Sequence, residues 1–157
     1  MPRILIADDS EILRSCLKSA LTHATGWPVC GEAANGQQAV LLADQLKPDL
    51  VILDFAMPIL NGIEAAKEIF KGTPAVPVVI YTIHPSWHLE LEAKRLGIRS
   101  VVSKADGLNV LIAKIKEVIG LGEAPQTPAA ASGAPPGAKA PAESLPQPPK
   151  KRAPSDS

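Results

Sequence analysis

Short apolar runs alternate with amphipathic stretches along the first 120 residues of the chain. Several of the runs are continuously apolar, which is typical of parallel strands that are covered on both faces. The pattern predicts five strands, at Arg3–Ala7, Trp27–Ala33, Leu50–Leu53, Val76–Tyr81 and Ser100–Val102.

The stretches between these runs follow the helical period. The first has on one face Ile12, Leu13, Cys16, Leu17, Ala20 and Leu21. The last repeats its apolar residues at Leu108, Leu111, Ile112, Ile115, Val118 and Ile119. Asn35 and Asn61 can each cap a helix, with Gln38 and Glu64 three residues later, close to a capping box. Strand and helix alternate five times, which predicts an α/β fold with a doubly wound parallel sheet.

Composition limits the class of protein. Hydrophobic residues make up 46% of the chain but aromatic residues only 3%, so the core must be aliphatic. The formal net charge is zero, which does not indicate a nucleic-acid or membrane-surface protein. Cys16 and Cys30 are too few for a disulfide framework, and we expect buried free thiols in a reducing cytoplasm. No signal peptide is visible, and no apolar run reaches the roughly 18 residues that span a bilayer. The sequence predicts a soluble cytoplasmic protein.

The composition changes sharply near Gly120. Residues 121–157 contain nine prolines, and Leu121 and Leu145 are the only large apolar residues there. Such a segment buries too little apolar surface to offset its ordering entropy, so we expect a disordered tail after a domain of residues 1–120. The tail has four basic and three acidic residues, too little net charge for DNA binding. Its run Lys150–Arg152 is either a solvated charge run or a binding motif.

Polar residues follow four of the five strands. Asp8 and Asp9 come after the first, Asp54 after the third and Thr82 after the fourth, while Lys104 follows the fifth after one serine. In open parallel sheets, ligands bind beyond the carboxyl ends of the strands, where the strand order reverses. If the order is 2-1-3-4-5, the first and third strands are neighbours and their three carboxylates converge in one pocket.

Three carboxylates in one pocket repel one another, and a cation is the usual remedy. Hard oxygen ligands suit Mg²⁺, which also binds phosphate oxygens. One carboxylate can then act as a nucleophile toward phosphorus, and Lys104 and Thr82 could stabilise the charge on the phosphoryl oxygens. Taken alone, Asp9 could be a helix cap, Thr82 an ordinary strand residue and Lys104 a surface lysine. Their coincidence at one sheet edge favours a functional site.

At this point a family resemblance becomes specific. Asp8-Asp9-Ser10, the run Pro48–Pro58 followed by Asn61-Gly62, Thr82 and Ser103-Lys104 resemble the receiver domain of bacterial response regulators. The resemblance covers about residues 1–120. It implies a flavodoxin-like sheet of five parallel strands in the order 2-1-3-4-5, with helices on both faces.

The resemblance also implies roles for individual residues. Asp54 would be the phosphoacceptor, Thr82 the hydroxyl that moves to meet the phosphate, and Lys104 the ammonium that contacts it. Asp9 would bind Mg²⁺ directly, and Asp8 would bind it through water or orient the site. The complete set of implied Mg²⁺ ligands is Asp8, Asp9, Asp54 and the main-chain carbonyl of Ala56. Such a domain is a signalling module that assists its own phosphorylation and dephosphorylation, not an enzyme.

Two positions depart from the family pattern. Val101 stands where receivers usually have an aromatic residue that changes rotamer with Thr82, although Tyr81 or Trp87 could partly substitute. Ala105 stands where a cis-proline is common, and a cis bond without proline would cost roughly 2.5–4 kcal/mol. His84, two residues after Thr82, is either an ordinary loop residue or a modulator of the phosphate lifetime.

The implied partners are proteins. A histidine kinase or histidine phosphotransfer protein would donate the phosphate, and the signal would leave through the fourth helix, the strand Ser100–Val102 and the last helix, to a downstream protein or to a second copy. We expect no direct DNA binding and no membrane. One alternative is the receiver part of a transcription regulator whose helix-turn-helix output domain is absent, because the segment Ser103–Gly107 resembles that of receivers usually joined to such a domain. Another is a phosphorylation-independent interaction domain. A Mg²⁺-dependent phosphatase is a distant alternative, because its Asp-x-Asp motif is absent after the first strand.

Overall fold

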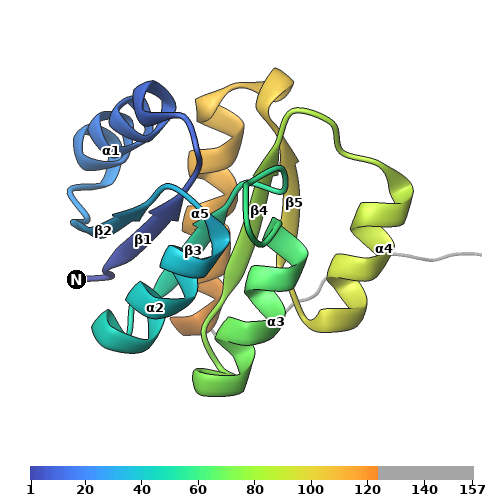
Figure 1. Ribbon diagram of the computed structural model, residues 1–157. Helices are drawn as coiled ribbons and strands as arrows, with labels where there is room; N and C mark the ends of the chain where they lie inside the picture. The colour runs from blue at the N-terminus through green and yellow to red at the C-terminus, as the bar shows by residue number, and fades with distance from the viewer. Residues whose placement is uncertain (124–157) are drawn as a thin grey trace, which may run out of the picture. The chain divides into compact units, whose positions relative to one another are not determined.

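The computed structural model, which describes residues 1–123, has five β-strands that alternate with five α-helices (Figure 1). The strands are β1 (Ile4–Ala7), β2 (Val29–Ala33), β3 (Leu50–Leu53), β4 (Val78–Thr82) and β5 (Ser100–Ser103). The helices are α1 (Glu11–Thr25), α2 (Gly36–Leu46), α3 (Gly62–Gly72), α4 (Trp87–Leu96) and α5 (Leu108–Glu123), and the 3-10 turn η1 is Lys104–Asp106. The predicted tail lies outside the described residues, apart from the end of α5. No helix within residues 1–123 is long and apolar enough to span a bilayer.

The sheet has the predicted order, β2-β1-β3-β4-β5, and every pair of neighbours is parallel. Its hydrogen bonding continues past the strand ends, where Asp8 N donates to Ala33 O at 3.0 Å and Asp54 N donates to Ala7 O at 2.9 Å. These two bonds hold the aspartates that follow β1 and β3 in fixed positions at the carboxyl edge of the sheet.

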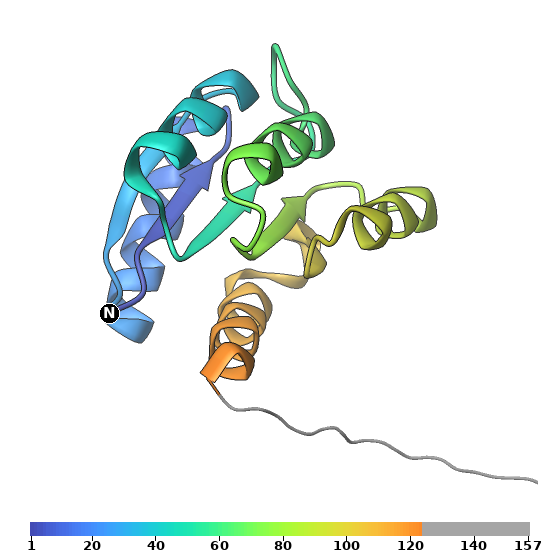
Figure 2. The same ribbon diagram turned by 90° about the horizontal axis from the view of Figure 1, so that it is seen from below.

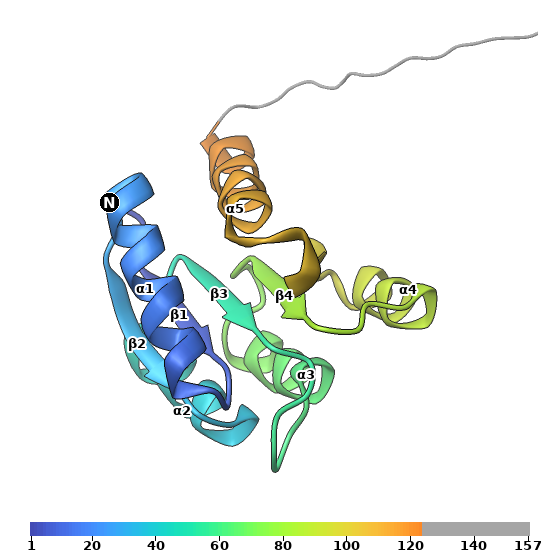
Figure 3. The ribbon, with the colours of Figure 1, turned by 90° about the horizontal axis from the view of Figure 1, so that it is seen from above.

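Two apolar layers cover the sheet. Alternate side chains of a strand point to opposite faces, so Ile4 and Ile6 pack with α1 and α5, whereas Leu5 and Ala7 pack with α2, α3 and α4. Figure 3 looks down on the carboxyl edge and shows α1 and α5 across the strands from α3. Figure 2 shows the opposite edge, where the N-terminus lies. The core is aliphatic, as the composition predicts.

β2 and β4 each begin two residues later than the sequence predicts, because prolines precede them. Pro28 and Pro77 lack an N–H and cannot donate to the ladder, so β2 begins at Val29 and β4 at Val78. The carbonyls of both prolines still accept hydrogen bonds, from Ile4 N and Val51 N at 3.0 Å each.

The predicted face of the first helix is only partly the buried one. Leu17 and Leu21 are buried against the sheet, but Ile12 is 78% exposed and Cys16 is also exposed. These two residues lie about 100° around the helix from Leu13 and Leu17, beyond the edge of the contact. Cys30 is only half-buried on the edge strand β2, so the prediction of two buried thiols is wrong.

Both predicted asparagine caps are confirmed. Asn35 accepts from Gln38 N at 2.8 Å, and Asn61 accepts from Glu64 N at 2.9 Å while Glu64 returns a bond to Asn61 N. The loop before Asn61 is strained, because Ile59 has a φ of 73° although its side chain is β-branched. Gly62 follows, and a Cβ at this position would lie 2.6 Å from the Asp54 carbonyl oxygen. The loop therefore approaches the end of β3 closely.

We expect Ile59→Gly to raise the free energy of unfolding by about 1 kcal/mol, because glycine adopts a positive φ without a steric penalty. The Ile59 side chain is 67% exposed, so little burial is lost. Urea denaturation would measure the change. Ile83→Gly is the control, since Ile83 is 60% exposed without a positive φ, and it should not stabilise the protein. Equal effects of both substitutions would contradict the strain argument.

Candidate functional site

All the residues that the sequence predicts for the site line one pocket at the carboxyl edge of the sheet. The pocket has a volume of about 450 Å³. It is formed by the loops after β1, β3, β4 and β5, and its lining comprises Asp8, Asp9, Ser10, Asp54, Phe55, Ala56, Thr82, Ile83, His84 and Lys104. Asp8 and Lys104, 96 positions apart in sequence, meet there because the strand order brings the strand ends together.

Three carboxylates converge in this pocket. Asp8, Asp9 and Asp54 can each present an oxygen within 4.8 Å of the others. Asp8 is 2% exposed and Asp54 is 5% exposed, whereas Asp9 is exposed. Two buried carboxylates and a third at the rim form a hard oxygen donor set, and such a set fits Mg²⁺ with room for water. The predicted convergence of the three aspartates is confirmed by this geometry.

Lys104 partly neutralises the buried acids. Its Nζ donates to Asp8 Oδ2 at 2.7 Å and lies 3.4 Å from Asp54 Oδ2. Burial alone would lower the pKa of Lys104, but the hydrogen bond to Asp8 and the charges of both acids outweigh it and raise the pKa. The ammonium therefore stays charged. It also lies 5.9 Å from the ring centroid of Tyr81.

Asp54 remains electrostatically unfavourable despite Lys104. Burial raises the pKa of this carboxyl, and the neighbouring charge of Asp8 raises it further. Lys104 and a 3.4 Å hydrogen bond from Ala56 N to Asp54 Oδ1 oppose the shift without cancelling it. The side chain is thus a desolvated carboxylate, and a cation bound beside it would offset its repulsion with Asp8.

Asp8 is held from every side. Its N–H donates to Ala33, its Oδ1 accepts from Ser10 N at 2.8 Å, and its Oδ2 accepts from Lys104. Its main-chain carbonyl accepts from the Arg14 guanidinium. Asp9 differs, because its carboxylate accepts no hydrogen bond from any other described residue. Asp8 is therefore a fixed group, and Asp9 is free to take a ligand.

The Thr82 side chain lies at the end of β4 and is 3% exposed. Its hydroxyl makes no hydrogen bond to any residue in the described range 1–123, which is unusual for a buried hydroxyl. Ile83 and His84 follow it and line the same pocket. His84 therefore borders the space in which a phosphoryl group on Asp54 would lie.

The two departures from the family pattern have structural consequences. Val101 pairs with Ile80 and packs with the core on the α2, α3 and α4 side of the sheet. Tyr81 packs on the opposite face, so it does not occupy the space beside Val101. Trp87 is 69% exposed and stacks on His88 with ring centroids 4.2 Å apart. Ala105 lies in η1, and all peptide bonds in the described part of the chain are trans.

Sequence reasoning missed Arg14, the residue that contacts the main chain of Asp8. Arg14 resembles any solvated charge on an amphipathic helix, and its spacing from Asp8 carries no metal-ligand signature. Only the position of α1 beside β1 and β2 shows that its side chain reaches the site.

Comparison with known proteins identifies the family of this chain. The family model for the response regulator receiver domain matches residues 4–116. The chain belongs to this family. It is 39% identical over 102 residues to the chemotaxis protein CheY of Thermotoga maritima, covering 65% of this chain and 84% of CheY. It is 38% identical over 104 residues to the transcriptional regulatory protein YdfI of Bacillus subtilis, covering 66% of this chain but 48% of YdfI.

A solved structure of a response regulator has the same fold. The LuxR-family response regulator from Aurantimonas superposes with a TM-score of 0.73 at 28% identity, covering 76% of this chain and 86% of that one. The family assignment confirms a phosphoacceptor signalling domain of the two-component type. Receiver domains use Mg²⁺ at an acidic pocket, and Asp8, Asp9 and Asp54 form such a pocket here. The family match does not support the phosphatase alternative.

We expect Asp54→Asn to melt at a higher temperature than the parent at neutral pH in chelator, by about 4 °C. Because the folded-state pKa of Asp54 is raised, the folded chain binds its proton more tightly than the unfolded chain, and ionisation destabilises the fold as pH rises through that pKa. The difference should shrink on acidification. Asp44→Asn is the control, since the Asp44 side chain is 71% exposed. Equal melting of parent and Asp54→Asn at neutral pH would disprove the repulsion.

Proposed function

We propose that Asp54 accepts a phosphoryl group from a histidine kinase or histidine phosphotransfer protein in the cytoplasm. The observation that carries this proposal is the convergence of Asp8, Asp9 and Asp54 beside Lys104 in one pocket. Asp54 is the acid of this set that follows the central strand β3. One of its oxygens would attack phosphorus as the phosphorus–nitrogen bond of phosphohistidine breaks. The imidazole nitrogen keeps the bonding electron pair and leaves as neutral imidazole, since the other ring nitrogen carries a proton.

The remaining residues of the pocket have complementary roles in this proposal. Asp9, Asp54 and the main-chain carbonyl of Ala56 would bind Mg²⁺ directly, and Asp8 would bind it through water or orient the site. Mg²⁺ supplies positive charge that offsets the repulsion between the carboxylates and the phosphoryl oxygens. Lys104 Nζ is 3.4 Å from Asp54 Oδ2, within reach of a phosphoryl oxygen attached to that carboxylate. The free hydroxyl of Thr82 would donate to a second phosphoryl oxygen.

The output surface that we propose lies over α4, β5 and α5. Lys104 and Thr82 are at the edge of β5 and β4, so a change in their contacts reaches this surface first. Ile83 lines the pocket and is 60% exposed, and Trp87 lies just beyond it, 69% exposed. Exposed apolar side chains next to the pocket suit a protein partner or a second copy of this chain. Phosphorylation can change this surface only if the phosphoryl group stabilises one conformation of the domain more than the other.

Phosphorylation is tested by incubating the protein with acetyl phosphate and Mg²⁺ and measuring its mass. We expect the gain of one phosphoryl group in the parent and none in Asp54→Asn or in chelator. Thr82→Ala should still gain the group, because its hydroxyl is proposed to sense the phosphate and not to accept it. A phosphorylated Asp54→Asn variant would overturn the assignment of the acceptor.

The output surface is tested by comparing amide NMR spectra with and without beryllofluoride and Mg²⁺, which mimic the phosphate. We expect shifts around Asp54 that extend to α4, β5 and α5, including Trp87, Glu90 and Lys94. The shifts on α4 should be smaller in Thr82→Ala, since this residue would transmit the change. Perturbations that stay within the pocket would show that this output surface is wrong.

A further inference from the structure

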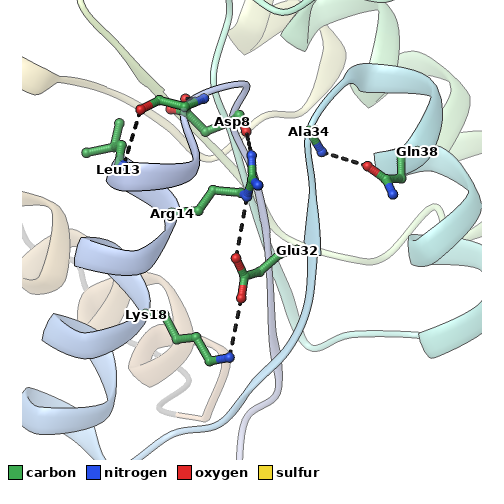
Figure 4. A network of polar contacts seen from close by, with 8 residues as sticks. Asp8, Leu13, Arg14, Lys18, Glu32, Ala34 and Gln38 are labelled. Carbon is green, nitrogen blue, oxygen red and sulfur yellow. Dashed lines mark hydrogen bonds and ion pairs between the residues drawn. The ribbon is translucent and has the colours of Figure 1, made fainter.

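Arg14 connects three elements at the edge of the acidic pocket (Figure 4). It lies on α1, and its Nη1 donates to the main-chain carbonyl of Asp8 at the end of β1. Its Nε donates to Glu32 Oε1 on β2 at 3.4 Å. The Arg14 side chain is only 14% exposed, so the guanidinium is held between the helix and the sheet.

Glu32 is in turn held by two cations. Its Oε1 pairs with Arg14, and its Oε2 pairs with Lys18 Nζ at 3.3 Å (Figure 4). Glu32 belongs to β2 and stands opposite Ile6 of β1 in the sheet register. Because β2 is paired to β1, the backbone of Glu32 is fixed, and its carboxylate holds the guanidinium from that position. Lys18 shares this carboxylate but is 52% exposed and has no hydrogen bond to Asp8.

The carbonyl that Arg14 contacts belongs to the peptide group that joins Asp8 to Asp9. A peptide group is planar, so fixing its carbonyl direction also fixes where the Cα of Asp9 lies. The Asp8 carboxylate is already held by Ser10 N and Lys104, whereas the Asp9 carboxylate accepts no hydrogen bond within residues 1–123. The placement of Asp9 therefore depends on the backbone, which Arg14 restrains at the Asp8 carbonyl and the Asp8 side chain restrains at Ser10 N.

We propose that Arg14 is a positioning residue for the metal site: it fixes the Asp8–Asp9 peptide so that both carboxylates face Asp54, and Glu32 holds it in place. The proposal rests on the proposed function, because it concerns Mg²⁺ binding by these aspartates. It adds two residues, Arg14 and Glu32, that touch neither metal nor phosphate. Residues that orient metal ligands commonly change metal affinity by about 10- to 100-fold when they are removed.

The direction in which Mg²⁺ affinity changes when Arg14 is replaced distinguishes a positioning role from a purely electrostatic one. A guanidinium beside three carboxylates repels an incoming cation, so removing it should by electrostatics alone strengthen Mg²⁺ binding. Loss of positioning should do the opposite. Arg14→Gln removes the charge and is too short to reach both the Asp8 carbonyl and Glu32. Lys18→Gln removes one positive charge from the same network and leaves the Asp8 carbonyl bound.

The experiment is titration of Mg²⁺ into the metal-free protein by calorimetry, for the parent and both variants. We expect Arg14→Gln to bind Mg²⁺ about 10-fold more weakly than the parent, and Lys18→Gln to bind it at least as tightly as the parent. Thermal melts in chelator show whether each variant is folded without metal, so that weaker Mg²⁺ binding is not mistaken for unfolding. If Arg14→Gln does not fold, Arg14→Lys replaces it, because a lysine keeps the positive charge but cannot contact both the Asp8 carbonyl and Glu32, and it too should weaken binding.

Amide NMR of the metal-free proteins gives a second readout. Arg14→Gln should shift the resonances of Asp9 and Ser10, and Lys18→Gln should leave them in place. Unchanged or tighter Mg²⁺ binding by Arg14→Gln would overturn the positioning role, as would equal weakening in Lys18→Gln. If the parent itself bound no Mg²⁺, the proposed function would fail first, so the two failures are distinguishable.

Discussion

The contact of Lys104 with Asp8 and Asp54 is the interaction on which the site depends. Two carboxylates that are almost fully buried would repel one another in the absence of a counter-charge, and Lys104 Nζ supplies it from 2.7 Å and 3.4 Å. The compensation is incomplete, because the pKa of Asp54 stays raised. The pocket therefore keeps an excess of negative charge that a bound cation would offset. If Lys104 neutralised both acids completely, the pocket would attract a cation less strongly.

The fold makes this arrangement possible by fixing the backbone where the charges crowd. Asp8 and Asp54 extend the hydrogen bonding of β1 and β3 by one residue, so their backbones cannot move apart without breaking the sheet. The aliphatic layers on both faces lock the strands in register. Arg14 adds a restraint from α1 on the peptide that follows Asp8. Local repulsion is therefore tolerated, because the rest of the sheet opposes a separation of the two strand ends.

The same geometry connects the pocket to the surface. Thr82 and Lys104 end β4 and begin η1, so groups that would contact a phosphate belong to segments that also lead to α4 and α5. Val101 fills the position of the usual aromatic residue with a smaller side chain packed in the core. A small side chain sweeps little volume when it changes rotamer. In the output model that we propose, the link between Thr82 and the surface would therefore rely more on the residues that follow β4, where Ile83 and, at the start of α4, Trp87 are exposed.

The sequence by itself determined the order of strands and helices, both asparagine caps and the family, because apolar periodicity and short motifs are local signals. It also identified the three aspartates, Thr82 and Lys104, since parallel strands must end at one edge. Only the tertiary structure decided that Ile12 and Cys16 face away from the core, because the contact angle of α1 depends on the sheet beneath it. Only the structure brought Arg14 to the Asp8 carbonyl, because that contact requires α1, β1 and β2 to pack together.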